Sequence, residues 1–250
     1  MKKTLSIFLF LTFLFSATSS FAQNDLNDEK GKLIINKSIE AHGGELYDTA
    51  NYSFVFRGKK YAFNHANGYS YSVEYSDSEG KKITDSLNNG KLTKYVNDQP
   101  VTLSEINTRK YEGALNSVIY FANLPYKLND KAVNKKFMGT DIIESENYDL
   151  VKVTFNKEGG GVDHEDEFLY WINTKTFKVD YLAYKYHVNG GGARFRSFYN
   201  RRNIDGITFQ DYINWKGSLD IPLKDMGKLF EQKKLKELSR IEISEIVNLK

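Results

Sequence analysis

A long succession of segments in which apolar and polar residues alternate constrains the fold more than any other feature of this sequence. In residues 69–76, for example, Tyr or Val occupies each odd position and Ser or Glu each even position. Alternation of this kind is typical of half-buried antiparallel strands. The turn Asn88-Asn89-Gly90 predicts a hairpin between 83–87 and 92–96.

Similar strand patterns resume after Pro125 and continue almost to the end of the chain. Glycine triplets at 159–161 and 190–192 are expected to form hairpin loops. The strands predicted in this half lie at 133–143, 148–155, 167–172, 179–188, 194–199 and 207–215, with a closing strand over 241–247.

Helical periodicity is confined to a few segments. It predicts helices at 25–42 and 103–122, the second weakened by Gly113, and a mostly helical, lysine-rich segment at 220–238. A parallel sheet needs a helix between successive strands, so doubly wound sheets and TIM barrels are excluded. The expected fold class is mainly β (α+β): a large curved antiparallel sheet or half-open β-barrel covered by two or three helices.

The N-terminus indicates export. Lys2 and Lys3 precede an apolar run over 5–15, and Ser20-Phe21-Ala22 has the small residues of a signal-peptidase cut after Ala22. We expect residues 1–22 to be a cleaved signal peptide and 23–250 to be a single domain, periplasmic or secreted. The signal peptide contains two of the 35 basic residues and none of the 32 acidic ones, so the mature chain is almost neutral and nucleic acid is not an expected partner.

Motifs of catalysis, nucleotide binding and metal binding are missing, and the chain has no cysteine. The acidic cluster 163–167 contains His164, and its position beside a glycine triplet favours a solvated loop. An exported hydrolase or metal-dependent enzyme that uses His164 with nearby carboxylates, or His65 and His187, is one alternative. We expect neither a cofactor nor a bound metal.

Four arginines at 194, 196, 201 and 202 form a basic stretch that has two interpretations. They can meet an anionic head group, or they can make a polar strand edge that discourages aggregation.

Aromatic residues gather on one face of many predicted strands. In a closed core these rings would simply pack together. A wide curved sheet under helices can instead leave an apolar cavity for a lipid-like ligand.

Three segments resemble LolA/LolB-like proteins, the periplasmic carriers of outer-membrane lipoproteins and their relatives. These are the helix end Ala41-His42-Gly43-Gly44 with the strand that runs into Arg57-Gly58, the stretch FLYWINTKT at 168–176, and the turn at 203–207. The sequence Phe21-Ala22-Gln23 is similar to signal-peptide ends of Bacteroidota. The resemblance implies a half-open antiparallel barrel with helices at its mouth and acyl chains inside.

The sequence therefore leads to a periplasmic, non-enzymatic carrier or binder of lipid or lipoprotein acyl chains as the main hypothesis. Its expected partners are a lipid or a lipidated protein, with transient contact at a membrane surface. An envelope interaction or scaffold protein with a filled core is a further alternative. The residues expected to line the cavity are Phe54, Phe56, Phe63, Tyr71, Val73, Phe121, Phe168, Tyr170 and Tyr184.

Overall fold

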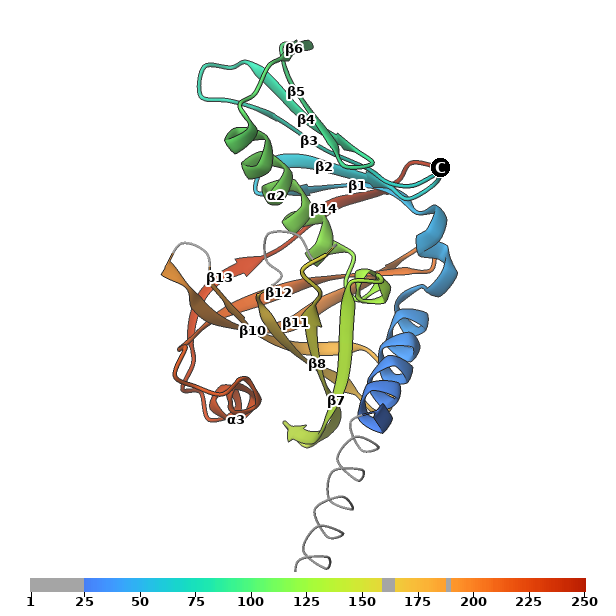
Figure 1. Ribbon diagram of the computed structural model, residues 1–250, viewed down its shortest axis with the longest axis vertical. Helices are drawn as coiled ribbons and strands as arrows, with labels where there is room; N and C mark the ends of the chain where they lie inside the picture. Colours follow the sequence, from blue (N-terminus) through green and yellow to red (C-terminus); the bar gives the residue numbers. More distant parts are fainter. Residues whose placement is uncertain (1–24, 159–164, 188–189) are drawn as a thin grey trace, which may run out of the picture.

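A computed structural model describes residues 25–158, 165–187 and 190–250 (Figure 1). The predicted signal peptide, the glycine triplet at 159–161 and His164 lie outside these ranges. The strands form two antiparallel seven-stranded sheets that do not close into a barrel, which confirms the mainly β class. Among the described residues, no helix is both long enough and apolar enough to cross a membrane.

The first sheet is a meander completed by the C-terminus. Its strand order is β14-β1-β2-β3-β4-β5-β6. The bounds are β1 Asn51–Phe56, β2 Lys59–Asn64, β3 Ser70–Ser76, β4 Lys82–Asn88, β5 Lys91–Val96, β6 Gln99–Val101 and β14 Ser244–Asn248. In this register Tyr71 lies opposite Leu87 and Phe63, so the apolar positions of neighbouring strands share one face.

The second sheet is also a meander, with the order β13-β12-β11-β10-β9-β8-β7. Its strands are β7 Val133–Ile143, β8 Glu146–Phe155, β9 Glu167–Asn173, β10 Val179–Tyr186, β11 Gly192–Ile204, β12 Ile207–Gly217 and β13 Lys236–Ile241. Alternation along β9 sends Phe168 and Tyr170 to one face and Leu169 and Trp171 to the other, and both sets are buried.

In the described part of the chain, helices cover faces of both sheets. The helix at residues 25–42 is followed by the 3-10 turn η1, Gly44–Thr49. Helix α2 spans Glu105–Ala122, and the Ser104 side chain caps it by accepting a hydrogen bond from the Asn107 amide at 3.3 Å. It therefore starts two residues later than predicted and continues unbroken through Gly113. The short turn η2, Tyr126–Asn129, leads from α2 into β7.

The segment 220–238 is the main error of the sequence prediction. Only η4, Leu223–Asp225, and the short helix α3, Met226–Glu231, are helical, and Lys236 already begins β13. Backbone pairing of β13 with the open edge of β12 prevails over the helix propensity of the lysines and leucines. The predicted closing strand is likewise divided, because β13 belongs to the second sheet and β14 to the first.

The apolar side chains form three clusters. The first lies between the first sheet, α2 and the start of β12, around Phe54, Ile119 and Phe209. The second lies between one face of the second sheet, the helix at 25–42 and the end of α2; we call this face the inner face. The third lies under α3 on the opposite, outer face, around Trp171 and Met226. Figure 1 shows α2 running from the first sheet toward the second.

Candidate functional site

The structure divides the nine predicted lining residues between two clusters. Five belong to the first cluster, where four of them are buried against their neighbours and one is half-buried: Phe54, Phe56, Phe63, Tyr71 and Val73. The rings of Phe54 and Tyr61 stack there with centroids 5.6 Å apart. These side chains belong to the packed layer that the first sheet forms with α2 and the start of β12.

The other four predicted residues meet on the inner face of the second sheet. Phe168 and Tyr184 lie opposite each other in the register of β9 and β10, and their rings stack with centroids 5.3 Å apart. Phe121 approaches Tyr184 from the last turn of α2, with centroids 6.1 Å apart. The Tyr170 hydroxyl is 3.2 Å from that of Tyr120, also on α2.

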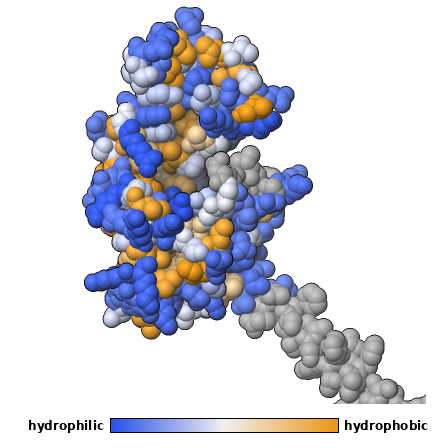
Figure 2. Space-filling view, turned by 90° about the vertical axis from the view of Figure 1, so that its left-hand side faces the viewer, coloured by the Kyte–Doolittle hydropathy of each residue, from blue (hydrophilic) through white to orange (hydrophobic). Residues whose placement is uncertain are grey.

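The inner face is only partly covered. Phe121 and Tyr184 are half-buried, and so are the neighbouring rings of Phe137, Phe155 and Phe198. Figure 2 shows apolar residues continuing inward between the upper and lower parts of one face of the molecule, with a hydrophilic rim. These rings therefore retain part of their accessible surface in the described structure.

A buried arginine lies among these rings. Arg196, on β11, is 7% exposed, and its guanidinium carbon is 3.8 Å from the centroid of the Phe121 ring. The rings of Tyr184 and Tyr212 are 5.2 and 5.5 Å from it. The Nη2 atom donates to the Tyr184 hydroxyl at 3.0 Å, whereas Nε and Nη1 have no hydrogen-bond partner in the described structure.

Among the described residues, no carboxylate forms an ion pair with Arg196, whereas Arg201 and Arg202 each have one. Burial raises the pKa of the Tyr170, Tyr212 and Tyr120 hydroxyls above their ordinary value, so these groups are neutral. Ring faces attract the cation, but they do not accept its N–H groups as a carboxylate would.

The other arginines of the basic stretch have local partners. Arg201 is paired with Asp180 and donates to the Gln210 side chain at 3.0 Å. Arg202 is paired with Asp211 at 2.6 Å. Arg194 is half-buried and donates to the Ala193 carbonyl at 2.8 Å. The sequence alone did not distinguish Arg196 from these three, because Arg194 and Arg196 alternate in the same way along the predicted strand.

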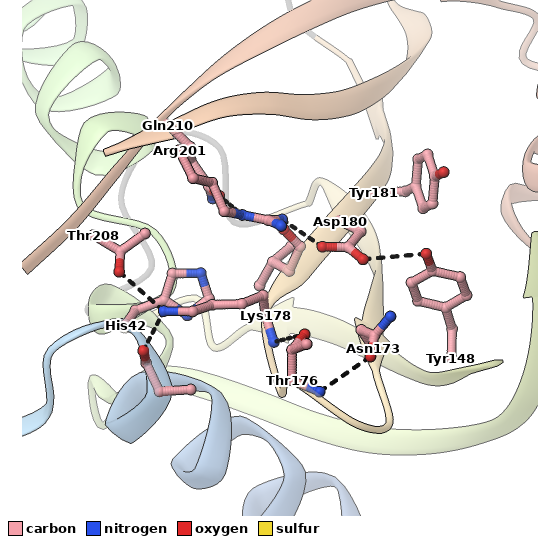
Figure 3. Close-up of polar contacts among 12 residues, drawn as sticks. His42, Tyr148, Asn173, Thr176, Lys178, Asp180, Tyr181, Arg201, Thr208 and Gln210 are labelled. Atoms are coloured by element: carbon pink, nitrogen blue, oxygen red, sulfur yellow. Dashed lines mark hydrogen bonds and ion pairs between the residues drawn. The ribbon is translucent and has the colours of Figure 1, made fainter. Parts of the chain in front are cut away.

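A second polar cluster lies where the helix at 25–42 ends on the second sheet (Figure 3). Lys178 donates to the Ala41 carbonyl and, at 2.9 Å, to the Thr208 hydroxyl. Burial, with Arg201 nearby, lowers the pKa of Lys178. Figure 3 also shows Asp180 between Arg201 and Tyr148, whose hydroxyl donates to it at 3.1 Å. A cation on the last-turn carbonyl of a helix stabilises that end, so this cluster anchors the helix to the sheet.

The histidines of the hydrolase alternative have separate surroundings. His65 is hydrogen-bonded through Nδ1 to the Tyr47 carbonyl at 2.8 Å and stacks on Tyr126. His187 is exposed, with Nδ1 3.7 Å from Asp166 Oδ1. Within residues 25–158, 165–187 and 190–250, no group of three or more His, Asp or Glu side chains is placed to hold a metal ion.

In a comparison with protein families, the chain matches the Family of unknown function DUF6503 over residues 2–243. The chain belongs to this family. No curated protein matches the chain significantly.

The DUF6503 chain is similar in fold to a solved LolA superfamily protein, NE2245 from Nitrosomonas europaea. The two share 14% identity with a TM-score of 0.53, over 88% of this chain and 93% of the other. A domain from Vibrio parahaemolyticus described as an outer membrane lipoprotein-sorting protein is 8% identical, with a TM-score of 0.48 over 89% of this chain and 94% of the other. The NE2245 match confirms the LolA-like fold expected from the sequence.

Proposed function

We propose that this protein is an exported, non-enzymatic binder or carrier of lipid or lipoprotein acyl chains. The acyl chain lies on the inner face of the second sheet, against Phe121, Phe168, Tyr170 and Tyr184. The observation that carries this proposal is the partly covered aromatic surface between the inner face, the helix at 25–42 and the end of α2.

Two further observations support the proposal. The fold is LolA-like, and the N-terminal sequence predicts export to the compartment in which lipoproteins are sorted.

Native mass spectrometry of the mature protein, purified under mild conditions, tests for a bound acyl lipid. We expect a species heavier than the polypeptide that loses its adduct on organic extraction and regains it with added lipid. A protein that retains no lipid and does not bind an uncharged fluorescent hydrocarbon probe would contradict the proposal.

A matched pair of tyrosine variants tests the location of the site. Tyr184 and Tyr75 are both half-buried strand residues, but Tyr184 lies on the second cluster and Tyr75 on the first. We expect Tyr184→Ala to weaken binding of the probe by about tenfold, because the ring provides apolar contact area. Tyr75→Ala is expected to leave it within about twofold. An equal loss in both variants would show that the inner face is not the site.

A further inference from the structure

Arg196 is buried at a cost that the described residues do not offset. Removing a guanidinium from water is unfavourable unless the charge is paired and its N–H groups are hydrogen-bonded. Here Nε and Nη1 together present three N–H groups without an acceptor, and the Tyr184 hydroxyl satisfies only Nη2. Contact with the faces of three rings compensates the charge only in part.

We propose that Arg196 receives the acidic head of the bound amphiphile, a singly charged oxyanion such as a carboxylate or a phosphodiester attached to a hydrocarbon chain. This assignment rests on the proposed function and names the class of its ligand. The planar guanidinium matches two oxygens of such a group in shape and in charge.

The surroundings of Arg196 fit both parts of an amphiphile. Phe121 and Tyr184, which contact the guanidinium, also belong to the half-buried aromatic surface, so a tail can lie on the rings while its head pairs with the cation. Asn214 lies directly opposite Arg196 in the register of β11 and β12, and its Oδ1 atom also has no partner in the described structure. This amide can hydrogen-bond a hydroxyl of the head group.

The basic stretch contains a matched control for this assignment. Arg194 is on the same strand and the same face, two residues before Arg196, but it is half-buried and donates to the Ala193 carbonyl. Arg194→Gln therefore removes one positive charge from the same strand without touching the buried guanidinium. Arg196→Gln removes the buried charge and keeps a polar side chain of moderate size.

Two amphiphiles with the same tail and different heads give the direct test. Hexadecanoic acid and hexadecan-1-ol are used to displace the uncharged hydrocarbon probe from the wild-type protein and both variants. We expect the wild type to prefer the acid by about tenfold to a hundredfold, the range for a hydrogen-bonded charge pair. Arg196→Gln is expected to abolish this preference with little change for the alcohol, and Arg194→Gln to retain it.

The outcomes separate this inference from the proposed function. Equal displacement by acid and alcohol in the wild type, or a preference that survives in Arg196→Gln, would overturn the role of Arg196 and leave acyl binding intact. Failure of both amphiphiles to displace the probe would overturn both proposals. Acetate or inorganic phosphate competing as well as the acid would show that the site binds a free anion instead.

Thermal unfolding of the ligand-free proteins gives a second readout. Because an unpaired buried charge is unfavourable, Arg196→Gln is expected to unfold at the same temperature as the wild type or a higher one. A large decrease in the unfolding temperature would show that the rings alone stabilise the cation, and would overturn the ligand assignment.

Discussion

His42 is buried without a charged partner at the end of the first described helix. Its Nδ1–H donates to the Ser38 carbonyl at 2.8 Å, and Nε2 has no hydrogen-bond partner in the described structure. Burial, together with the nearby cations Lys178 and Arg201, lowers its pKa from 6.5 to about 3. The side chain is therefore neutral in the folded protein at neutral pH, although the same residue in the unfolded chain titrates near pH 6.5.

This difference predicts an acid-sensitive stability. The pKa of His42 is lower in the folded protein than in the unfolded chain. The contribution of neutral His42 to the unfolding free energy is therefore complete above pH 6.5, and it is lost as the pH falls toward 3. His42→Asn keeps a donor near the Ser38 carbonyl and does not titrate. We expect the wild type to lose about 1.4 kcal/mol more unfolding free energy than this variant for each pH unit below 6.5. Denaturant unfolding between pH 7 and 4.5 measures this difference. Unfolding free energies that fall in parallel with pH in the two proteins would contradict the prediction.

At the scale of single residues, the sequence predicted which face of a strand a side chain occupies better than it predicted what surrounds that side chain. Alternation along β9 placed Phe168 and Tyr170 on one face, and the structure brings both to the second cluster. Alternation does not show which rings from separate segments fill a core and which remain partly uncovered. Nor did it separate Arg196 from its neighbours, because an ion pair such as Arg202–Asp211 depends on the register of two strands.

At the scale of elements, two helical glycines have opposite surroundings. A Cβ atom at Gly113 of α2 would meet no atom within 4 Å, whereas one at Gly31 would lie 2.8 Å from the Lys135 carbonyl oxygen of β7. A residue with higher helix propensity than glycine would therefore fit at position 113 without a steric clash. Gly31 instead allows the backbone of the first helix to approach the second sheet closely.

These surroundings predict opposite effects of one substitution. Gly113→Ala is expected to raise the unfolding free energy by about 0.5–1 kcal/mol, since alanine loses less backbone entropy in a helix. Gly31→Ala is expected to lower it, because the new methyl group collides with the backbone of β7. Denaturant unfolding of both variants checks the pair. A change in unfolding free energy of the same sign in both variants would show that close backbone approach does not explain the glycine at position 31.

Most strands could be predicted because the alternation of apolar and polar residues that marks each strand lies within its own segment of the sequence. The bounds predicted for 133–143 coincide with β7, and β8, β9 and β12 differ from their predictions by a few residues at most. The error at 220–238 has a different origin. The segment Lys236–Ile241 is a strand because β12 offers an open edge, and no pattern within those six residues carries that information.

At the scale of the whole molecule, the C-terminus joins the two sheets. Residues 242–243 carry the chain from β13 on the second sheet to β14, which pairs with β1 on the first. Tyr52 lies opposite Asn248 in that pairing, almost two hundred residues away in the sequence. The sequence predicted antiparallel strands under helices, but pairing between such distant segments left no local pattern from which two separate sheets could be inferred.

This pairing predicts a local effect of truncation. Removal of residues 244–250 deletes β14 and leaves β1 as an unpaired edge. In hydrogen-exchange mass spectrometry we expect faster exchange in β1 and β2, while β8 to β10 in the second sheet remain protected. Exchange that increases equally in both sheets would show that the sheets unfold as one unit and that β14 is needed for both.

Helix α2 contributes side chains to two clusters at once, with Leu115 and Ile119 facing the first sheet and Tyr120 and Phe121 reaching the second. The helix cannot withdraw from the inner face unless Leu115 and Ile119 also change their contacts with β3 and β4. The packing of α2 on the first sheet is therefore coupled to its packing on the inner face. Substitution of Leu115 or Ile119 should alter binding of the proposed acyl ligand, although neither residue belongs to the second cluster.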